Sequence, residues 1–204
     1  MTQQWPICEG LIVTEKASGQ PHLAPMGPFV SPDGLQLQLR PFQSSRTFGH
    51  LMDRRRGVFH VTDDVELLAQ AAIGRVAPSP NFERTPSGSG WYLPSACRWM
   101  EFEITQVDVS ESRSVMQARV TDVGTLRDFF GFHRARHAVV EAAILATRVG
   151  ILDREEIETE LKRLQVWVDK TGTAAEHRAF QLLCDYVDEF ETQSAEVLED
   201  TPTS

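Results

Sequence analysis

The sequence predicts a mainly β protein with helices at its C-terminal end: an antiparallel barrel or sandwich of about six strands, then about three helices. Two observations support this prediction. Up to about residue 125, segments of strand length alternate with turn signals rich in Gly, Pro, Ser and Asp. From Leu126 onward, the apolar residues recur with helical spacing.

The first two strand segments differ in regularity. Residues 8–16 predict a strand that ends at a turn signal in residues 17–20. Residues 22–30 contain Pro25 and Pro28, and proline cannot donate a hydrogen bond to a neighbouring strand. We therefore expect 22–30 to form an edge strand or an interrupted strand.

A turn, a strand and a short helix come next. Ser-Pro-Asp-Gly at 31–34 predicts a turn, since proline presets φ and glycine accepts a positive φ. Residues 35–40 alternate apolar and polar side chains, which predicts a half-buried strand. Either Ser44 or Ser45 can cap a short helix that runs through Met52.

The middle of the chain contains one more strand, a helix and a long loop. Residues 57–62 predict a strand, and Asp63 or Asp64 then caps a helix that ends at Gly74. Residues 76–90 are rich in Pro, Ser and Gly, which predicts a long loop. Long loops in compact domains are usually functional or mobile.

Two strands and three helices complete the chain. Residues 98–109 and 114–123 predict strands, and 129–148 predicts a helix that is apolar on most faces and therefore buried. Apolar stripes in 157–168 and 180–190 predict two further amphipathic helices.

Composition restricts the class of protein. The 204 residues are 41% hydrophobic and 24% charged, close to globular averages, and no run approaches the roughly 20 apolar residues of a membrane span. The N-terminus lacks the pattern of a secretory signal. The three cysteines are far apart, which indicates reduced thiols in the cytoplasm and argues against structural zinc.

The charge is unevenly distributed along the chain. The net charge is −9, and 14 acidic against 5 basic residues between Asp153 and Asp200 account for all of it. Five arginines cluster against the single acid Asp53 (Arg40, Arg46, Arg54, Arg55 and Arg56). An acidic chain with one basic segment argues against general nucleic-acid binding and suits a small anionic ligand.

The segment 39–48 is the one most indicative of chemistry. It leaves a strand, turns at a proline and enters a helix, and helix N-termini attract phosphate. The hydroxyls of Ser45 and Thr47 can donate to phosphate oxygens, and Arg46 can donate two hydrogen bonds at once. The alternative is an ordinary helix cap with surface arginines.

Several motifs, in order and at compatible spacings, resemble the FMN-binding split barrels related to flavin reductases and flavoredoxin. They are Leu-Ala-Pro-Met-Gly-Pro at 23–28, Arg-Pro-Phe-Gln-Ser-Ser-Arg-Thr at 40–47, Gly-Val-Phe-His-Val-Thr-Asp-Asp at 57–64 and the helix at 126–143. The sequence resembles most a branch of unknown function with a C-terminal helical extension. The resemblance runs from about residue 9 to about residue 186.

The resemblance implies a split barrel that forms a homodimer, with one FMN at each end of the interface. It implies that Ser45, Arg46 and Thr47 hold the phosphate and that the isoalloxazine ring lies along the backbone of 24–27. The alternative for 24–27 is a plain kink in an edge strand. Flavin reductases often have an asparagine near the position that His50 occupies in this sequence.

Two other groups are candidates for the flavin site. Arg134 or Arg136 is expected to reach the flavin or its phosphate across the dimer. His60 is a candidate proton donor, with a structural histidine as the alternative. The complete set of expected FMN contacts is Ala24, Pro25, Met26, Gly27, Arg40, Ser44, Ser45, Arg46, Thr47, His60 and Arg134.

One helical face carries His133, His137 and Glu141 at intervals of four residues. Two histidines one turn apart can bind zinc, but such pairs are common on helices. We therefore expect no metal site.

The expected domains are a barrel at 1–125, a helical extension at 126–196 that packs on the barrel and on a dimer partner, and a disordered tail at 197–204. The function expected is that of a cytoplasmic FMN-dependent oxidoreductase whose substrate and electron donor are unknown. The alternatives are a non-catalytic flavin carrier or sensor, and a structural dimer that has lost FMN. Neither nucleic acid nor membrane is an expected partner.

Overall fold

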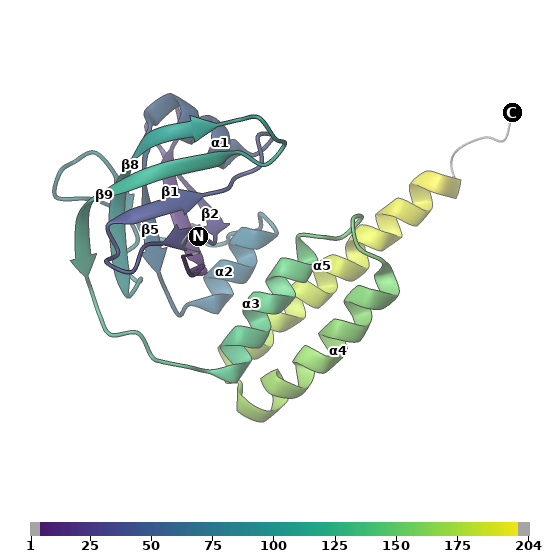
Figure 1. The fold of residues 1–204 in the computed structure, drawn as a ribbon. Coiled ribbons are helices and arrows are strands. Elements are labelled where there is room, and N and C mark those ends of the chain that lie inside the picture. Colours follow the sequence, from purple (N-terminus) through teal and green to yellow (C-terminus); the bar gives the residue numbers. More distant parts are fainter. Residues whose placement is uncertain (1–4, 200–204) are drawn as a thin grey trace, which may run out of the picture. The chain divides into compact units, whose positions relative to one another are not determined.

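The computed structural model describes the backbone of residues 5–199 and the side chains of residues 5–190. The predicted class is confirmed: a mainly antiparallel sheet is followed by C-terminal helices (Figure 1). In chain order the elements are β1 (Gly10–Glu15), β2 (Pro21–Met26), β3 (Phe29–Val30), β4 (Gln36–Leu39), α1 (Arg46–Arg54), β5 (Arg56–Val61), α2 (Val65–Ala72), β6 (Glu83–Arg84), β7 (Trp91–Tyr92), β8 (Arg98–Asp108), β9 (Val115–Thr125), α3 (Arg134–Ala146), α4 (Arg154–Thr171) and α5 (Ala174–Glu199).

The chain forms two compact units. The barrel unit contains the residues up to Asp63 and Pro78–Phe129, and the helical unit contains Asp64–Ala77 and the residues from Phe130 onward. The sequence-based division had placed 64–77 with the barrel. The structure groups this segment with the helices because α2 packs against α3 and α5.

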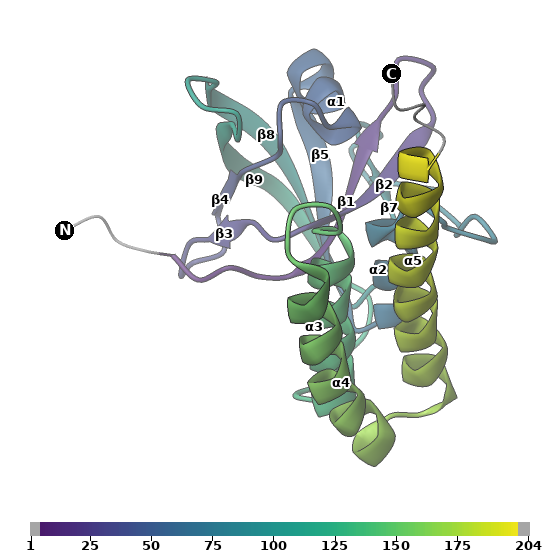
Figure 2. The ribbon, with the colours of Figure 1, turned by 90° about the vertical axis from the view of Figure 1, so that its right-hand side faces the viewer.

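The sheet of the barrel unit must curl, because its two edge strands are consecutive in sequence. The strand order is β2-β1-β5-β8-β9-β4-β3, so β2 and β3 lie at opposite edges. Only Gly27 and Pro28 separate them, and three Cα–Cα steps span at most about 11 Å. The two edges are therefore held close together, and the sheet curls as a half-barrel (Figure 2).

The interruption predicted within 22–30 is confirmed. β2 pairs only with β1, and Pro25 lies opposite Leu11 in that ladder. After the break, the amide of Cys8 donates to the carbonyl of Pro28 at 3.0 Å, and Ile7 forms a bridge with Phe29. The segment before β1 therefore bonds to the chain at the point where it crosses between the two edges.

The barrel interior is filled by side chains from most of its strands and from α1. Its core consists of Ile12, Leu37, Leu39, Leu51, Phe59, Met100, Phe102, Ile104, Met116 and Ala118. Gly10 allows β1 to approach β5 closely, because a Cβ at this position would lie 2.2 Å from the carbonyl oxygen of His60. A glycine is therefore required at position 10 by this packing.

The predicted caps of the first two helices are present. Ser45 caps α1, and its side-chain oxygen accepts from the amide of Phe48 at 3.2 Å. Asp64 caps α2 in the same way, accepting from the amide of Leu67 at 3.0 Å. Asp63 has a different role, since its carboxylate accepts from the guanidinium of Arg127 through both oxygens.

The predicted loop at 76–90 contains a short hairpin, because β6 pairs with β7. The turn of this hairpin is held by the carboxylate of Glu101, which is only 3% exposed. The hydroxyls of Thr85, Ser87 and Ser89 all donate to this carboxylate, at distances of 2.5–3.2 Å. The loop is thus tied to β8 by hydrogen bonds to a buried charge.

The prediction that a helix begins at residue 129 is wrong. Residues 129–133 are not helical, because Gly131 has a φ of 102° and interrupts the helical backbone. His133 then caps α3, and its Nδ1 accepts from the amide of Arg136 at 3.3 Å. The aromatic residues before His133 therefore precede the helix.

Small residues let α3 pack closely within the helical unit. Its buried side chains are Ala135, Ala138, Val139, Ala142, Ala143 and Ala146, and it packs against α2, α4 and α5. α5 begins with a capping box: both the amide and the hydroxyl of Thr173 donate to the carboxylate of Glu176. The guanidinium of Arg136 donates to the other oxygen of Glu176 at 3.0 Å.

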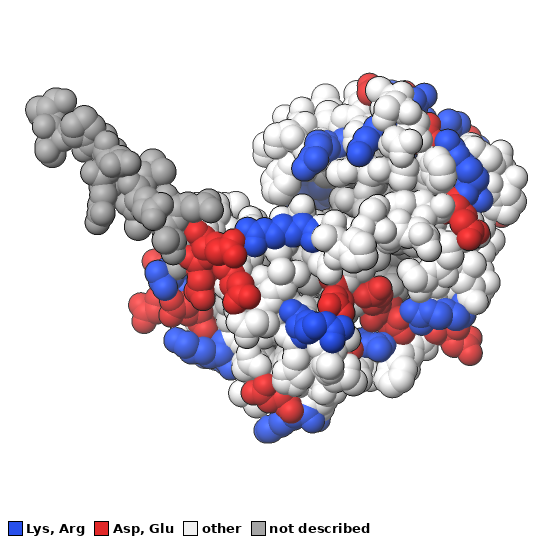
Figure 3. Space-filling model, turned by 180° about the vertical axis from the view of Figure 1, so that it is seen from behind, with Lys and Arg blue, Asp and Glu red and all other residues white. Residues whose placement is uncertain are grey.

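The surface of the helical unit carries charges of both signs close together (Figure 3). Several form ion pairs within α4, for example Glu158 with Arg154 and Lys162. No helix among the described residues is long and apolar enough to span a membrane.

The predicted tail at 197–204 lies only partly within the described residues. Within the described residues, the backbone of α5 extends to Glu199, and disorder of the tail stays a prediction. Residues 200–204 lie outside the part of the chain that the structure describes.

Replacing Glu101 by alanine is expected to destabilise the barrel unit by about 2 kcal/mol, because three hydroxyls lose their acceptor and Thr85 is buried. Urea unfolding followed by tryptophan fluorescence measures this change. The matched control is Glu103→Ala on the same strand, where the lost ion pair with Arg119 is exposed and contributes less than about 0.5 kcal/mol. Equal effects of the two substitutions would contradict the role given to Glu101.

Candidate functional site

The N-terminus of α1 presents two backbone amides that the helix itself does not use. The first intrahelical hydrogen bond runs from the amide of Gly49 to the carbonyl of Ser45, and the amide of Phe48 is taken by the Ser45 side chain. The amides of Arg46 and Thr47 precede these bonds and are the donors that a helix N-terminus offers to an anion.

The side chains around this N-terminus differ in accessibility. Ser44 and Arg46 are exposed, Ser45 is half-buried, and Thr47 is buried at 5% exposure. Arg40 is also exposed, and its carbonyl accepts from Nε of Arg113 at 2.9 Å. The exposed guanidinium of Arg46 is therefore available beside the two amides.

The second predicted segment, 24–27, lies on the edge strand β2 and the crossing that follows it. Ala24, Pro25, Met26 and Gly27 are all half-buried. Ala24 and Met26 pack against the barrel core, as does Phe48 of α1. This segment is thus partly accessible, and no strand covers its outer edge within the described sheet.

Two histidines join these segments. The rings of His22, on β2, and His50, on α1, are in edge-to-face contact with centroids 4.9 Å apart. The hydroxyl of Thr14 on β1 lies 3.0 Å from Nδ1 of His50 and fixes its ring. The contact places His22, at the start of β2, beside His50 in the second turn of α1. It joins the strand and the helix that carry the two predicted segments, and a closer approach of 24–27 to Ser45, Arg46 and Thr47 stays a prediction.

Positive charge accumulates around this pair. Burial, together with the charges of His50, Arg46 and Lys16, lowers the pKa of His22 to about 4. Burial, Lys16 and Arg46 also lower the pKa of His50, and Asp53 opposes this shift. Both rings are therefore neutral near pH 7. The cations Lys16 and Arg46 disfavour a further positive charge at this place and favour the binding of an anion.

The sequence contains a signal for both histidines, although the analysis of the sequence did not select them as ligands. His50 follows Arg46 by four residues and therefore shares its helix face. His22 precedes Ala24 by two residues and shares its strand face.

The backbone at Gly27 approaches a carboxylate closely. A Cβ at Gly27 would lie 2.6 Å from Oε1 of Glu9, so a larger residue at this position would displace the end of the Glu9 side chain. Glu9 is exposed. The carboxylate of Glu9 therefore lies at the C-terminal end of the segment 24–27, and His22 precedes the N-terminal end of this segment.

His60 does not belong to the site. It is fully buried, its Nδ1 lies 3.3 Å from the carbonyl of Leu11, and its Nε2 accepts from the amide of Leu93 at 3.1 Å. Burial lowers its pKa to about 4, so the ring is neutral and donates from Nδ1. Both nitrogens are thus occupied inside the barrel, which makes His60 a structural histidine and corrects its assignment as a ligand.

Arg134 lies on the helical unit, where its guanidinium stacks on the ring of Trp167 at 5.0 Å from the centroid. Arg136 is held by Glu176. A contact from either arginine to a flavin stays a prediction.

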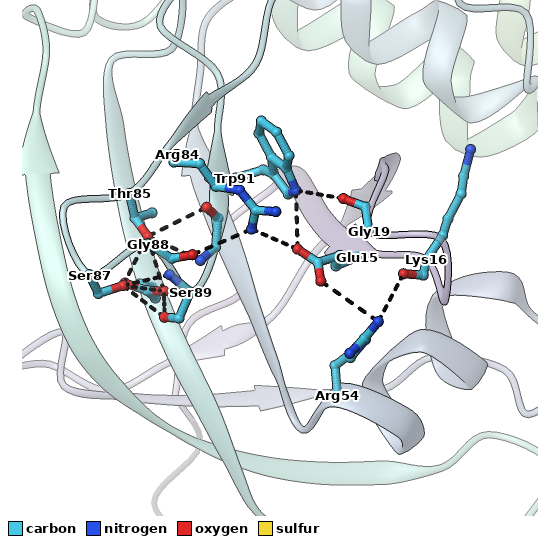
Figure 4. A network of polar contacts seen from close by, with 12 residues as sticks. Glu15, Lys16, Gly19, Arg54, Arg84, Thr85, Ser87, Gly88, Ser89 and Trp91 are labelled. Carbon is cyan, nitrogen blue, oxygen red and sulfur yellow. Dashed lines mark hydrogen bonds and ion pairs between the residues drawn. The ribbon is translucent and has the colours of Figure 1, made fainter.

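A second polar network lies on the barrel unit and was not predicted. The carboxylate of Glu15, whose side chain is 11% exposed, accepts from Arg84 at 2.7 Å and from Nε1 of Trp91 at 3.2 Å (Figure 4). Arg54 lies 3.8 Å from the other oxygen, and Arg84 stacks on Trp91 at 3.9 Å. Glu15 thus ties the end of α1 and the hairpin to β1, next to Lys16.

The described residues contain no group of three His, Cys, Asp or Glu side chains arranged to hold a metal. His133 uses its Nδ1 for the cap of α3, and the ring of His137 packs edge-on against Phe132. The three cysteines, Cys8, Cys97 and Cys184, are free thiols.

Two family models match the sequence, and together they cover most of it. The model described as "Protein of unknown function (DUF447) N-terminal domain" matches residues 8–127, and a second DUF447 model matches residues 133–185. The chain belongs to the DUF447 family. A search of curated protein sequences gives no match to this DUF447 chain.

Solved structures share the fold of this DUF447 chain. An FMN-bound DUF447 protein from Methanosarcina mazei is similar with a TM-score of 0.77 and 22% identity, over 90% of this chain and 96% of that one. A flavin reductase domain protein from Arthrobacter sp. FB24 is similar with a TM-score of 0.51 and 17% identity, over 61% of this chain and 80% of that one. These similarities confirm the split-barrel fold predicted from the sequence.

Proposed function

We propose that this DUF447 chain binds FMN at the corner between β2 and α1 and uses it as an oxidoreductase. The observation that supports this most directly is the His22–His50 contact, since it joins the accessible edge strand to the helix whose N-terminus offers donors to a phosphate. The FMN bound by the DUF447 protein from Methanosarcina mazei supports the choice of ligand.

The residues present fit a phosphate monoester. The amides of Arg46 and Thr47 and the exposed guanidinium of Arg46 supply donors, and Lys16 adds a second cation. The half-buried face of Ala24 and Met26 offers apolar surface for a flat ring.

When bound, FMN supplies hydride or electron transfer, and the protein orients it and tunes its ring. In this proposal Arg46 and the α1 amides fix the phosphate, and the backbone of 24–27 lies along the ring. Glu9, beside Gly27, places a carboxylate at the same segment. Three free thiols and the resemblance to flavin reductases support a cytoplasmic location.

Reduction by nicotinamide separates the oxidoreductase from a flavin carrier or sensor. We expect the FMN complex to be yellow and to lose its visible absorbance under anaerobic NADH or NADPH. A yellow protein that neither donor reduces would support the carrier. A colourless protein that ignores added FMN would overturn the proposal and support a structural dimer that has lost the cofactor.

Replacing both Arg46 and Thr47 by alanine is expected to weaken FMN binding by about 100-fold, because charge-assisted hydrogen bonds to phosphate are lost. Fluorescence quenching of FMN measures the dissociation constant. Arg119→Ala, at an exposed arginine of β9, is the matched control and should keep the native affinity. If the double variant bound FMN with native affinity, the assignment of the phosphate site to the N-terminus of α1 would be wrong.

We further propose that the chain is a homodimer, and the segment that precedes α3 in the helical unit supports this. Phe130 is 67% exposed and Phe132 is 96% exposed, which is unusual for large apolar side chains on a monomer surface. Sedimentation equilibrium is expected to give twice the chain mass of 22.9 kDa.

The Phe130→Ser, Phe132→Ser double variant is expected to shift this equilibrium toward the monomer. Ile151→Ser, at another exposed apolar residue of the helical unit, is the control and should leave the native mass unchanged. A monomeric native chain, or a double variant as dimeric as the native protein, would contradict this proposal.

A further inference from the structure

The pair of His22 and His50 is placed for a role that an ordinary phosphate site lacks. The two rings touch, and each comes from an element that carries one of the assigned segments: His50 lies one helical turn after Arg46 on α1, and His22 lies two residues before Ala24 on β2. Both are half-buried and therefore reachable from solvent.

We propose that His22 and His50 form a proton-accepting element of the phosphate site, so that the phosphate group of the ligand binds together with a proton. This inference rests on the proposed FMN site and deepens it. It identifies the favoured ligand as a phosphate dianion and makes its retention dependent on pH.

Burial is the largest cause that lowers the pKa of both rings, and the charges that face the pair add to this effect or oppose it. Without ligand, His22 is opposed by Lys16, Arg46 and the ring of His50. His50 is opposed by Lys16 and Arg46, and Asp53 is the only acidic group that acts on it among the described residues. The hydroxyl of Thr14 can either donate to Nδ1 of His50 or accept from it, so it tolerates both protonation states.

A dianion bound at Arg46 would reverse this balance. It offsets the two cations and favours the charged imidazolium, which raises the pKa of both rings in the complex into the range between about pH 6 and about pH 8. A proton is then taken up wherever the pH lies between the pKa of the free protein and that of the complex. Since the pKa of free His22 is about 4, affinity for the dianion must rise as the pH falls toward that value.

The same arrangement discriminates between flavins. Riboflavin has the same ring as FMN and lacks the phosphate, so its binding involves no dianion to stabilise the imidazolium. Proton-linked binding is therefore expected for FMN and for small dianions and not for riboflavin.

The test measures the dissociation constant of FMN by fluorescence quenching between about pH 8 and about pH 6. The native protein is expected to bind FMN about five to ten times more tightly at the lower pH. The His22→Gln, His50→Gln double variant should lose this gain, and His177→Gln, at an exposed histidine of α5, should keep it. Circular dichroism confirms that each variant is folded.

A second measurement does not depend on FMN. Inorganic sulfate, which stays a dianion over this range, should raise the NMR titration midpoints of His22 and His50 and leave that of His177 unchanged. Identical pH profiles in the native protein and the double variant, or midpoints that sulfate does not move, would overturn the proton-linked site. Absence of FMN binding at every pH would instead overturn the proposed function, so the two failures are distinguishable.

Discussion

The two-residue crossing at Gly27 and Pro28 is the constraint on which the rest of the barrel unit depends. It joins strands at opposite edges of the seven-stranded sheet, so the sheet has to curl for the chain to be connected at all. Pro28 provides a carbonyl that is bonded to Cys8, and Gly27 leaves room for Glu9. β2 ends at this crossing and pairs only with β1, so it is an edge strand. Its half-buried residues are therefore available to a ligand.

The candidate site is a consequence of this geometry. Curling brings the core beneath α1, which Leu51 anchors inside the barrel, and His50 in the second turn of α1 then contacts His22 on β2. Two carboxylates hold the surroundings in place: the half-buried Glu15 binds Arg84 and Trp91, and the buried Glu101 binds the hairpin turn. These contacts hold β1, the end of α1 and the hairpin in place. The amides of Arg46 and Thr47 and the guanidinium of Arg46 therefore remain available to a ligand.

Local features were predictable from the sequence, and contacts between distant residues were not. Residue types at adjacent positions predict the helix caps at Ser45 and Asp64. They also predict the interruption between β2 and β3, which lies at Gly27 and Pro28. The His22–His50 contact joins residues 28 positions apart, and the burial of His60 depends on Leu11 and Leu93, so no local pattern encodes either. The helix predicted from residue 129 failed because helical spacing was read through Gly131, whose positive φ interrupts it.

The central claim is that the corner between β2 and the first turn of α1 binds the phosphate of FMN. Backbone NMR during a titration with FMN tests it most directly. The account predicts the largest shifts for the amides of Arg46 and Thr47, with smaller shifts at 22–27. FMN that binds while these amides keep their positions in the spectrum would contradict it.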